Sequence, residues 1–102
     1  MRETDILQLC RMAASECGAV TFRNNVGKLQ DKNGRWVAYG VCNPGGADLI
    51  GWTKDGRFLA IEVKRPGKKA TTEQENFLHA VNKAGGIGAV VTSPEEVIKL
   101  LK

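Results

Sequence analysis

Three residues of the sequence have types and spacing that could support metal-assisted chemistry at a phosphate ester: Asp48, Glu62 and Lys64. They lie on the two sides of a short turn, Lys54-Asp55-Gly56, between two β-prone runs. A three-residue loop that ends in a left-handed glycine would place Asp48 directly opposite Glu62 in an antiparallel hairpin. Lys64 lies two residues beyond Glu62, so it would share the same face.

A different turn would separate the two acids. A two-residue Asp-Gly turn would put Asp48 opposite Val63 and would send the carboxylates to opposite faces of the hairpin. The hydrophobic pattern favours the three-residue loop, because Leu49 then joins Leu59, Ile61 and Val63 in one apolar layer. We therefore expect the two acids and the lysine on the other face.

Facing carboxylates need compensation. At about 5 Å they repel by roughly 1 kcal/mol in water and by about 3 kcal/mol at an effective dielectric constant near 20. A divalent cation that prefers oxygen ligands, such as Mg²⁺ or Mn²⁺, would offset this repulsion. The charge pattern alone leaves a second interpretation open, in which Glu62 pairs with Lys64 and Asp48 is solvated at the surface.

The composition is that of one globular domain covering residues 1–102. The chain has 102 residues, 42% hydrophobic and 25% charged, and its apolar runs are too short to cross a membrane. Its polar, charged start argues against a signal peptide. The net charge of +4 suits a polyanionic partner. Three cysteines without a CxxC or Cys/His cluster favour a reducing, cytoplasmic location over a disulfide scaffold or a zinc site.

The periodicity predicts an α/β protein (a mixed α+β sheet) in the order α-β-β-β-β-α-β-α. The expected helices are 3–17, stopped by Gly18, then 72–84, opened by a Thr72/Glu75 capping box, and a short one ending near 101 after a second capping box at 93–96. The expected strands are 19–23, 35–41, 47–53, 57–64 and 87–92, the last apolar enough for burial on both faces. Segment 24–34 is expected to be a polar loop. The unit 57–92 should be a parallel crossover, so helices should pack on a mixed sheet.

Several other residues have more than one interpretation. Cys10 and Cys17 lie seven residues apart on the apolar helix face, which favours core filling. His79, in the middle of a helix, is expected to be a surface or packing residue. Four aromatic residues could form core, a base-stacking surface or a dimer patch, with core or interface favoured: Trp36, Tyr39, Trp52 and Phe58.

The motif residues resemble a known nuclease superfamily. Gly45-Gly46-Ala47-Asp48 followed by Glu62-Val63-Lys64 resembles the PD-(D/E)xK signature, and nearly the whole chain is similar to its VRR-NUC (virus-type replication-repair nuclease) family. The other supporting residues are Glu3, Arg23-Asn24-Asn25, 60–67, Gln74, Phe77 and 84–86. The proline that the superfamily name places before the acid is Ala47 here, at a position that shapes the turn and ligates nothing.

The resemblance implies a restriction-endonuclease-like core that hydrolyses DNA phosphodiesters with Mg²⁺ or Mn²⁺. It implies metal ligation by four groups: Asp48, Glu62, Glu3 and the backbone carbonyl of Val63. Lys64 would position or activate the attacking water, or stabilise the non-bridging oxygens. Gln74 would lie on the helix beside the site. Two of these residues also have ordinary structural interpretations, because Gln74 could simply cap Thr71 and Glu3 could simply favour a helix N-terminus.

Basic and polar residues near the motif are candidate contacts to nucleic acid. Arg65, Lys68 and Lys69 follow the motif in a Pro-Gly loop and could hold flanking phosphates, although a solvated charge run has the same appearance. Arg23, Asn24 and Asn25 could make backbone or phosphate contacts, or could be turn residues.

The function that these observations favour is a metal-dependent, structure-selective DNA endonuclease. The resemblance implies a homodimer acting on Holliday junctions or other branched DNA, in a bacterial or phage setting, with no membrane partner. A two-fold dimer offers two equivalent sites for the two equivalent strands of a four-way junction. The alternatives are a non-catalytic nucleic-acid-binding module, which would have no use for two acids facing phosphate, and a nuclease acting on linear or nicked DNA or on RNA.

Overall fold

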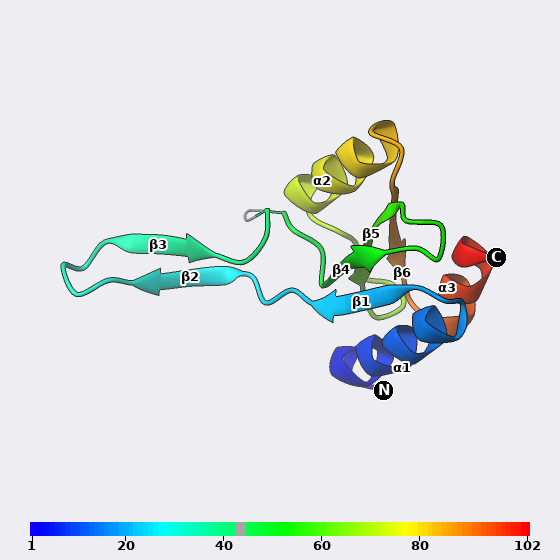
Figure 1. Ribbon diagram of the computed structural model, residues 1–102. Helices are drawn as coiled ribbons and strands as arrows, with labels where there is room; N and C mark the ends of the chain where they lie inside the picture. Colours follow the sequence, from blue (N-terminus) through cyan, green and yellow to red (C-terminus); the bar gives the residue numbers. More distant parts are fainter. Residues whose placement is uncertain (43–44) are drawn as a thin grey trace.

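The chain forms a four-stranded mixed sheet with helices on both faces and a separate two-stranded arm. A computed structural model describes residues 1–42 and 45–102 (Figure 1). The helices are α1 (Glu3–Glu16), α2 (Thr72–Lys83) and α3 (Pro94–Leu101). The strands are β1 (Val20–Arg23), β2 (Gly27–Gln30), β3 (Trp36–Tyr39), β4 (Leu49–Trp52), β5 (Phe58–Val63) and β6 (Ile87–Val91). The predicted mixed α/β class is confirmed, with one more strand than expected.

The main sheet has the strand order β1-β4-β5-β6. Strand β5 pairs antiparallel with β4 and parallel with β6, so the predicted crossover through α2 is confirmed. In the hairpin, Leu49 faces Ile61 and Trp52 faces Phe58, which is the register of the three-residue loop. Gly56 has a φ of +84°, the left-handed conformation that this loop needs.

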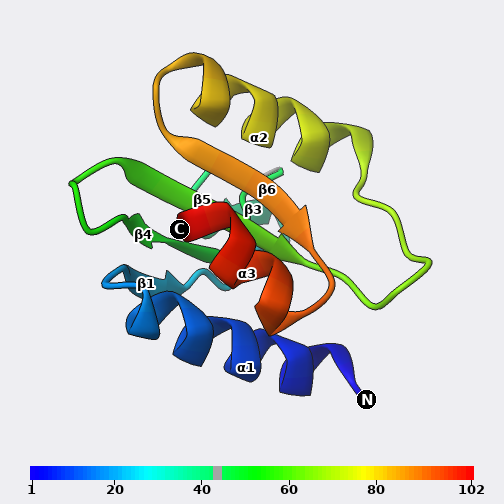
Figure 2. The same cartoon turned by 90° about the vertical axis from the view of Figure 1, so that its right-hand side faces the viewer.

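Two apolar clusters hold the helices on opposite faces of the sheet. Helices α1 and α3 cover one face, where Leu49, Leu59, Ile61 and Val63 are buried as the pattern predicts. Helix α2 covers the other face over β5 and β6 (Figure 2). Its buried residues pack with Ala60 in the smaller cluster. Glu62 lies on this α2 side, because its side chain alternates with those of Ile61 and Val63 along β5.

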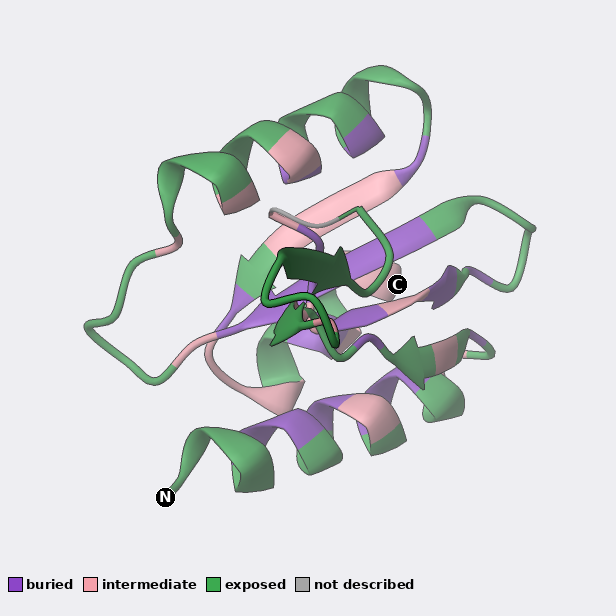
Figure 3. Cartoon of the chain, turned by 90° about the vertical axis from the view of Figure 1, so that its left-hand side faces the viewer, coloured by how far each residue is buried: buried purple, intermediate pink, exposed green. Residues whose placement is uncertain are grey.

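The segment expected to be a polar loop contains β2, so that prediction is wrong. Strand β2 pairs only with β3, and the two strands with their turn (27–39, hereafter the arm) project from the main sheet (Figure 1). The turn is closed by the Asp31 carboxylate, which accepts the backbone N–H groups of Asn33 and Arg35. The arm is solvent-exposed along nearly all of its length (Figure 3).

Three smaller expectations also need correction. The cap of α2 is one residue earlier than predicted, with Thr71 at the N-cap and Gln74 completing the capping box. Strand β6 is an edge strand and is only partly buried, with Val91 alone among its residues classed as buried. The four aromatic residues expected in core or interface are all exposed, which excludes a core role: Trp36, Tyr39, Trp52 and Phe58.

Candidate active site

Asp48 and Glu62 meet just beyond the last paired residues of the β4–β5 hairpin. Each carboxylate holds a backbone amide of the opposite strand. The N–H of Asp48 donates to Glu62 Oε1 at 3.1 Å, and the N–H of Val63 donates to Asp48 Oδ2 at 2.9 Å. These side chains continue the hydrogen bonding of the sheet where its regular ladder stops. The two acids are therefore fixed by the strand ends.

Lys64 and Gln74 both contact the second oxygen of Glu62. The Lys64 Nζ atom lies 3.3 Å from Glu62 Oε2, and Gln74 Nε2 donates to the same oxygen at 2.7 Å. The Oε1 atom of Gln74 accepts the N–H of Thr71 at 2.8 Å. Gln74 therefore caps the helix and contacts the acidic pair at once. The structure thus contains both a capping contact of Gln74 with Thr71 and a contact of Gln74 with Glu62.

Burial makes this acidic pair costly when it is charged. Glu62 is only 2% exposed, and its burial followed by the nearby charge of Asp48 raises its pKa to about 7. Burial also raises the pKa of Asp48, and the charge of Glu3 acts in the same direction. Lys64 opposes both shifts by its positive charge. The pair is thus arranged to gain from an added positive charge.

Glu3 and Arg23 lie beside the pair. A small cavity of about 80 Å³ is lined by Glu3, Thr4, Leu7, Arg23, Asp48 and Val63. Glu3 is on the first turn of α1, and Arg23 ends β1 next to Leu49. Within residues 1–42 and 45–102, no three Asp, Glu, His or Cys side chains form a group that could hold a metal ion. Glu3 therefore faces the same cavity as Asp48 without completing a three-acid group.

The basic loop after β5 begins at the site. Arg65, Lys68 and Lys69 are exposed, and the Lys68 N–H donates to the Arg65 carbonyl at 3.0 Å to close a turn. Asn25 is exposed where the chain leaves β1 for the arm. Because Lys64 directly precedes Arg65, the loop carries its positive charges away from the acidic pair along one edge of the molecule.

Asn24, which the sequence offers as a backbone or phosphate contact or as a turn residue, is a positioning residue in the structure. Its N–H donates to the Asp48 carbonyl at 2.7 Å, and its Nδ2 donates at 3.0 Å to the carbonyls of Ala47 and Val41. Its Oδ1 accepts the Val41 N–H at 2.9 Å. Asn24 therefore ties the end of β1 to the Asp48 segment and to the base of the arm. The sequence shows only an asparagine after a β-prone run, and nothing in it indicates these distant partners.

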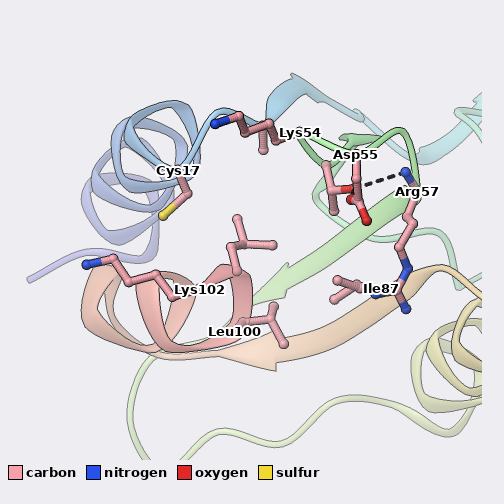
Figure 4. A pocket seen from close by; sticks show the side chains of 10 residues that line it. Cys17, Lys54, Asp55, Arg57, Ile87, Leu100 and Lys102 are labelled. Atoms are coloured by element: carbon pink, nitrogen blue, oxygen red, sulfur yellow. Dashed lines mark hydrogen bonds between the residues drawn. The ribbon is translucent and has the colours of Figure 1, made fainter.

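A larger cleft lies at the far end of the hairpin and takes no part in the acidic site. Its volume is about 530 Å³, and it lies between the β4–β5 turn and the C-terminal helix (Figure 4). The N–H of Arg57 donates to Thr53 Oγ1 at 2.9 Å there, and the Arg57 guanidinium donates to the carbonyls of Gly85 and Gly86. The Arg57 guanidinium at this cleft is thus engaged in holding the turn between α2 and β6.

The chain folds as a small α/β domain with two facing acids and a lysine at the end of its central hairpin. A solved structure of a VRR-NUC domain superimposes with a TM-score of 0.64 and 22% sequence identity, covering 96% of this chain and 91% of that chain. The VRR-NUC domain family also matches residues 2–95. The chain therefore belongs to the VRR-NUC family, which is a family of nucleases. The comparison with curated proteins gives no match.

The residues at the site fit the divalent metal that such a nuclease suggests. Asp48 and Glu62 offer hard carboxylate oxygens, which Mg²⁺ and Mn²⁺ prefer. Their desolvation and mutual repulsion are costs that a cation would relieve.

In the described part of the chain, no helix has the length and apolar character required to cross a membrane.

Proposed function

We propose that this domain hydrolyses DNA phosphodiester bonds with Mg²⁺ or Mn²⁺. The observation that carries the proposal is the buried Asp48–Glu62 pair, with Lys64 and Gln74 on the outer oxygen of Glu62. The two backbone amides that these acids accept could be satisfied by neutral side chains, whereas phosphodiester hydrolysis needs carboxylates to hold a cation. We propose Asp48, Glu62, the Val63 carbonyl and Glu3 as ligands.

The chain's own residues have distinct tasks in this proposal. A bound divalent cation supplies positive charge beside the scissile phosphate and makes water more acidic. Asp48 and Glu62 fix its place relative to the sheet. Lys64 lies next to the pair and either orients the attacking water or stabilises charge on the non-bridging oxygens. Gln74 holds the Glu62 carboxylate in one orientation through its 2.7 Å hydrogen bond.

We also propose that the preferred substrate is branched DNA, in particular a four-way junction, cut by a homodimer. One chain carries one acidic pair, and a two-fold dimer would present two sites to two equivalent strands. Five residues around the site are proposed to contact DNA: Arg23, Asn25, Arg65, Lys68 and Lys69. The three cysteines are all free, which supports a reducing, cytoplasmic setting.

A cleavage assay with matched variants tests the activity. Purified protein is incubated with a four-way junction, a flap, linear duplex and RNA, each with Mg²⁺, Mn²⁺ or EDTA. Glu62→Gln and Lys64→Met should each slow cleavage by about 100-fold or more, because they remove a ligand and a charge used at the reacting phosphate.

The controls are the same substitutions at exposed positions on α2. Glu75→Gln and Lys83→Met should cleave at the wild-type rate, because both side chains are exposed and neither contacts the acidic pair. Cleavage that persists in EDTA or in Glu62→Gln would refute the metal mechanism. Binding of DNA without cleavage would instead favour a nucleic-acid-binding module, and faster cleavage of linear duplex or RNA would refute the junction preference.

A further inference from the structure

One half of the main sheet has an uncovered apolar face. Val20 pairs with Trp52, and Trp52 pairs with Phe58, so these three side chains point to the same side as Phe22. All four are exposed, and the rings of Phe22 and Trp52 lie 5.8 Å apart. Helix α2 packs on β5 and β6 on this side and leaves β1 and β4 open (Figure 2). We call these four side chains the open sheet face.

The arm also has an uncovered apolar face. Leu29 and Val37 lie opposite each other on one side of the arm, and they are 63% and 50% exposed. The other side carries Lys28 and Gln30 next to Trp36. An isolated two-stranded sheet is at best marginally stable in water, and this one projects beyond the main sheet (Figure 1). The Leu29–Val37 pair is a paired aliphatic contact that a partner surface would bury, whereas Trp36 on the other side is flanked by the polar Lys28 and Gln30.

We propose that the Leu29–Val37 side of the arm docks on the open sheet face of a second copy of this chain, and that the second copy's arm docks back in the same way. The inference rests on the homodimer of the proposed function and names the surface that forms it. Each chain carries both halves of the contact, so a two-fold axis satisfies both copies and closes the assembly.

The chemistry of the two surfaces fits a protein better than DNA. The four residues of the open sheet face and the Leu29–Val37 pair include no charge, whereas surfaces that bind DNA are polar and rich in Lys and Arg. Protein interfaces are enriched in aromatic residues and depleted of charge at their centres. The six side chains of the two surfaces are 40–63% exposed, and three of them are aromatic residues, each of which can bury about 150–250 Å². Together they supply a large part of the roughly 800 Å² that each partner buries in a standard interface.

A complementation experiment tests the reciprocal contact without DNA or metal. Leu29→Lys places a charge on the arm, and Phe22→Lys places one on the open sheet face. Analytical ultracentrifugation should find a wild-type dimer and should find each variant alone shifted toward the 11.1 kDa monomer, with dimerisation weakened about 100-fold or more. An equimolar mixture should regain part of the dimer, because one of its two contacts joins an intact arm to an intact face, while the other contact carries both added charges.

Matched controls and circular dichroism exclude general effects of the added charge. Gln30→Lys adds the same charge on the other side of the arm, and Met12→Lys adds it at an exposed site on α1, so both should stay dimeric. Melting temperatures within a few degrees of the wild type would show that the variants are folded. A monomeric wild type, a dimer insensitive to Phe22→Lys, or a mixture that does not recover would overturn the proposal. Because no substrate is present, a dimer found in an inactive protein would leave this inference standing and would refute only the activity.

Discussion

At the scale of single residues, the two acids are both structural and chemical groups. Each accepts a backbone amide from the opposite strand, at 3.1 Å and 2.9 Å, and so helps to close the end of the hairpin. The same arrangement brings two desolvated carboxylates together. The two facing carboxylates therefore lower the stability of the metal-free protein at the point where the proposed cation would bind.

Glu62→Gln tests this conflict between stability and chemistry. In EDTA the substitution should change the free energy of unfolding by less than about 1 kcal/mol. It removes one of two facing charges and keeps an oxygen for the Asp48 N–H, but its amide nitrogen faces the donors of Gln74 and Lys64, so the gain and the loss offset each other. Mn²⁺ should raise the melting temperature of the wild type and leave that of the variant unchanged. Thermal unfolding with and without Mn²⁺ gives both values. Glu75→Gln serves as the control, and an equal response of the two variants to Mn²⁺ would contradict the assignment.

The positions of the two acids and the lysine could be predicted because they depend on local rules. A strand alternates its faces with a period of two, and the turn residues fix the register of a hairpin. The contact of Gln74 with Glu62 depends instead on where α2 lies over the sheet, which the helix pattern does not contain. Its role as a candidate site residue came from the family resemblance and from nothing local.

At the scale of secondary-structure elements, Asn24 joins three segments that are distant in sequence. Asn24→Ala should lower the free energy of unfolding by about 2 kcal/mol, because the buried carbonyl of Ala47 and the part-buried backbone groups of Val41 would lose their partner. Cleavage should fall as well, since Asp48 is held through the same segment. Urea denaturation of Asn24→Ala beside Asn25→Ala gives the comparison. Replacing the exposed Asn25 should lower the free energy of unfolding by less than about 0.5 kcal/mol. A similar loss in both variants would contradict the role of Asn24 in joining the three segments.

The two errors in the elements have the same physical origin. Strand β2 has a weak β pattern, and it forms because β3 pairs with it across the Asp31 turn. Thr71 and Thr72 both start a possible capping box, with Gln74 and Glu75 respectively. The contact of Gln74 with Glu62 favours the first of them. In each case a tertiary contact decides between options that local sequence leaves equal.

At the scale of the whole molecule, composition does not reveal which aromatic side chains are exposed. Trp52 and Phe58 have the residue types of a core, yet both are exposed, because Trp52 lies on β4, away from α2, and Phe58 is the first residue of β5. A sequence pattern identifies the apolar side of a strand, whereas the length and position of the covering helix decide whether that side is buried. The open sheet face and the arm are therefore visible only in the assembled fold.

The reactivity of the Cys10 thiol is a measure of how tightly α1 and α3 pack on the sheet. Burial, followed by the charges of Glu96 and Glu95, raises the pKa of its thiol to about 11. The thiolate is the reactive form, so alkylation of Cys10 should be slow at neutral pH and should accelerate only as the pH approaches 11. Mass spectrometry after iodoacetamide treatment at pH 7 to about 9 should find Cys42 labelled and Cys10 unlabelled in the native protein. All three cysteines should react in urea, and native labelling of Cys10 at the rate of Cys42 would contradict the packing.

The arm begins after β1 and ends before β4, so it is inserted between two neighbouring strands of the main sheet. Its length and side chains can change over evolutionary time while the sheet that carries the acids keeps its shape. Natural variation or deliberate grafting of this segment would then alter which molecules assemble on the enzyme and leave the chemistry of cutting intact.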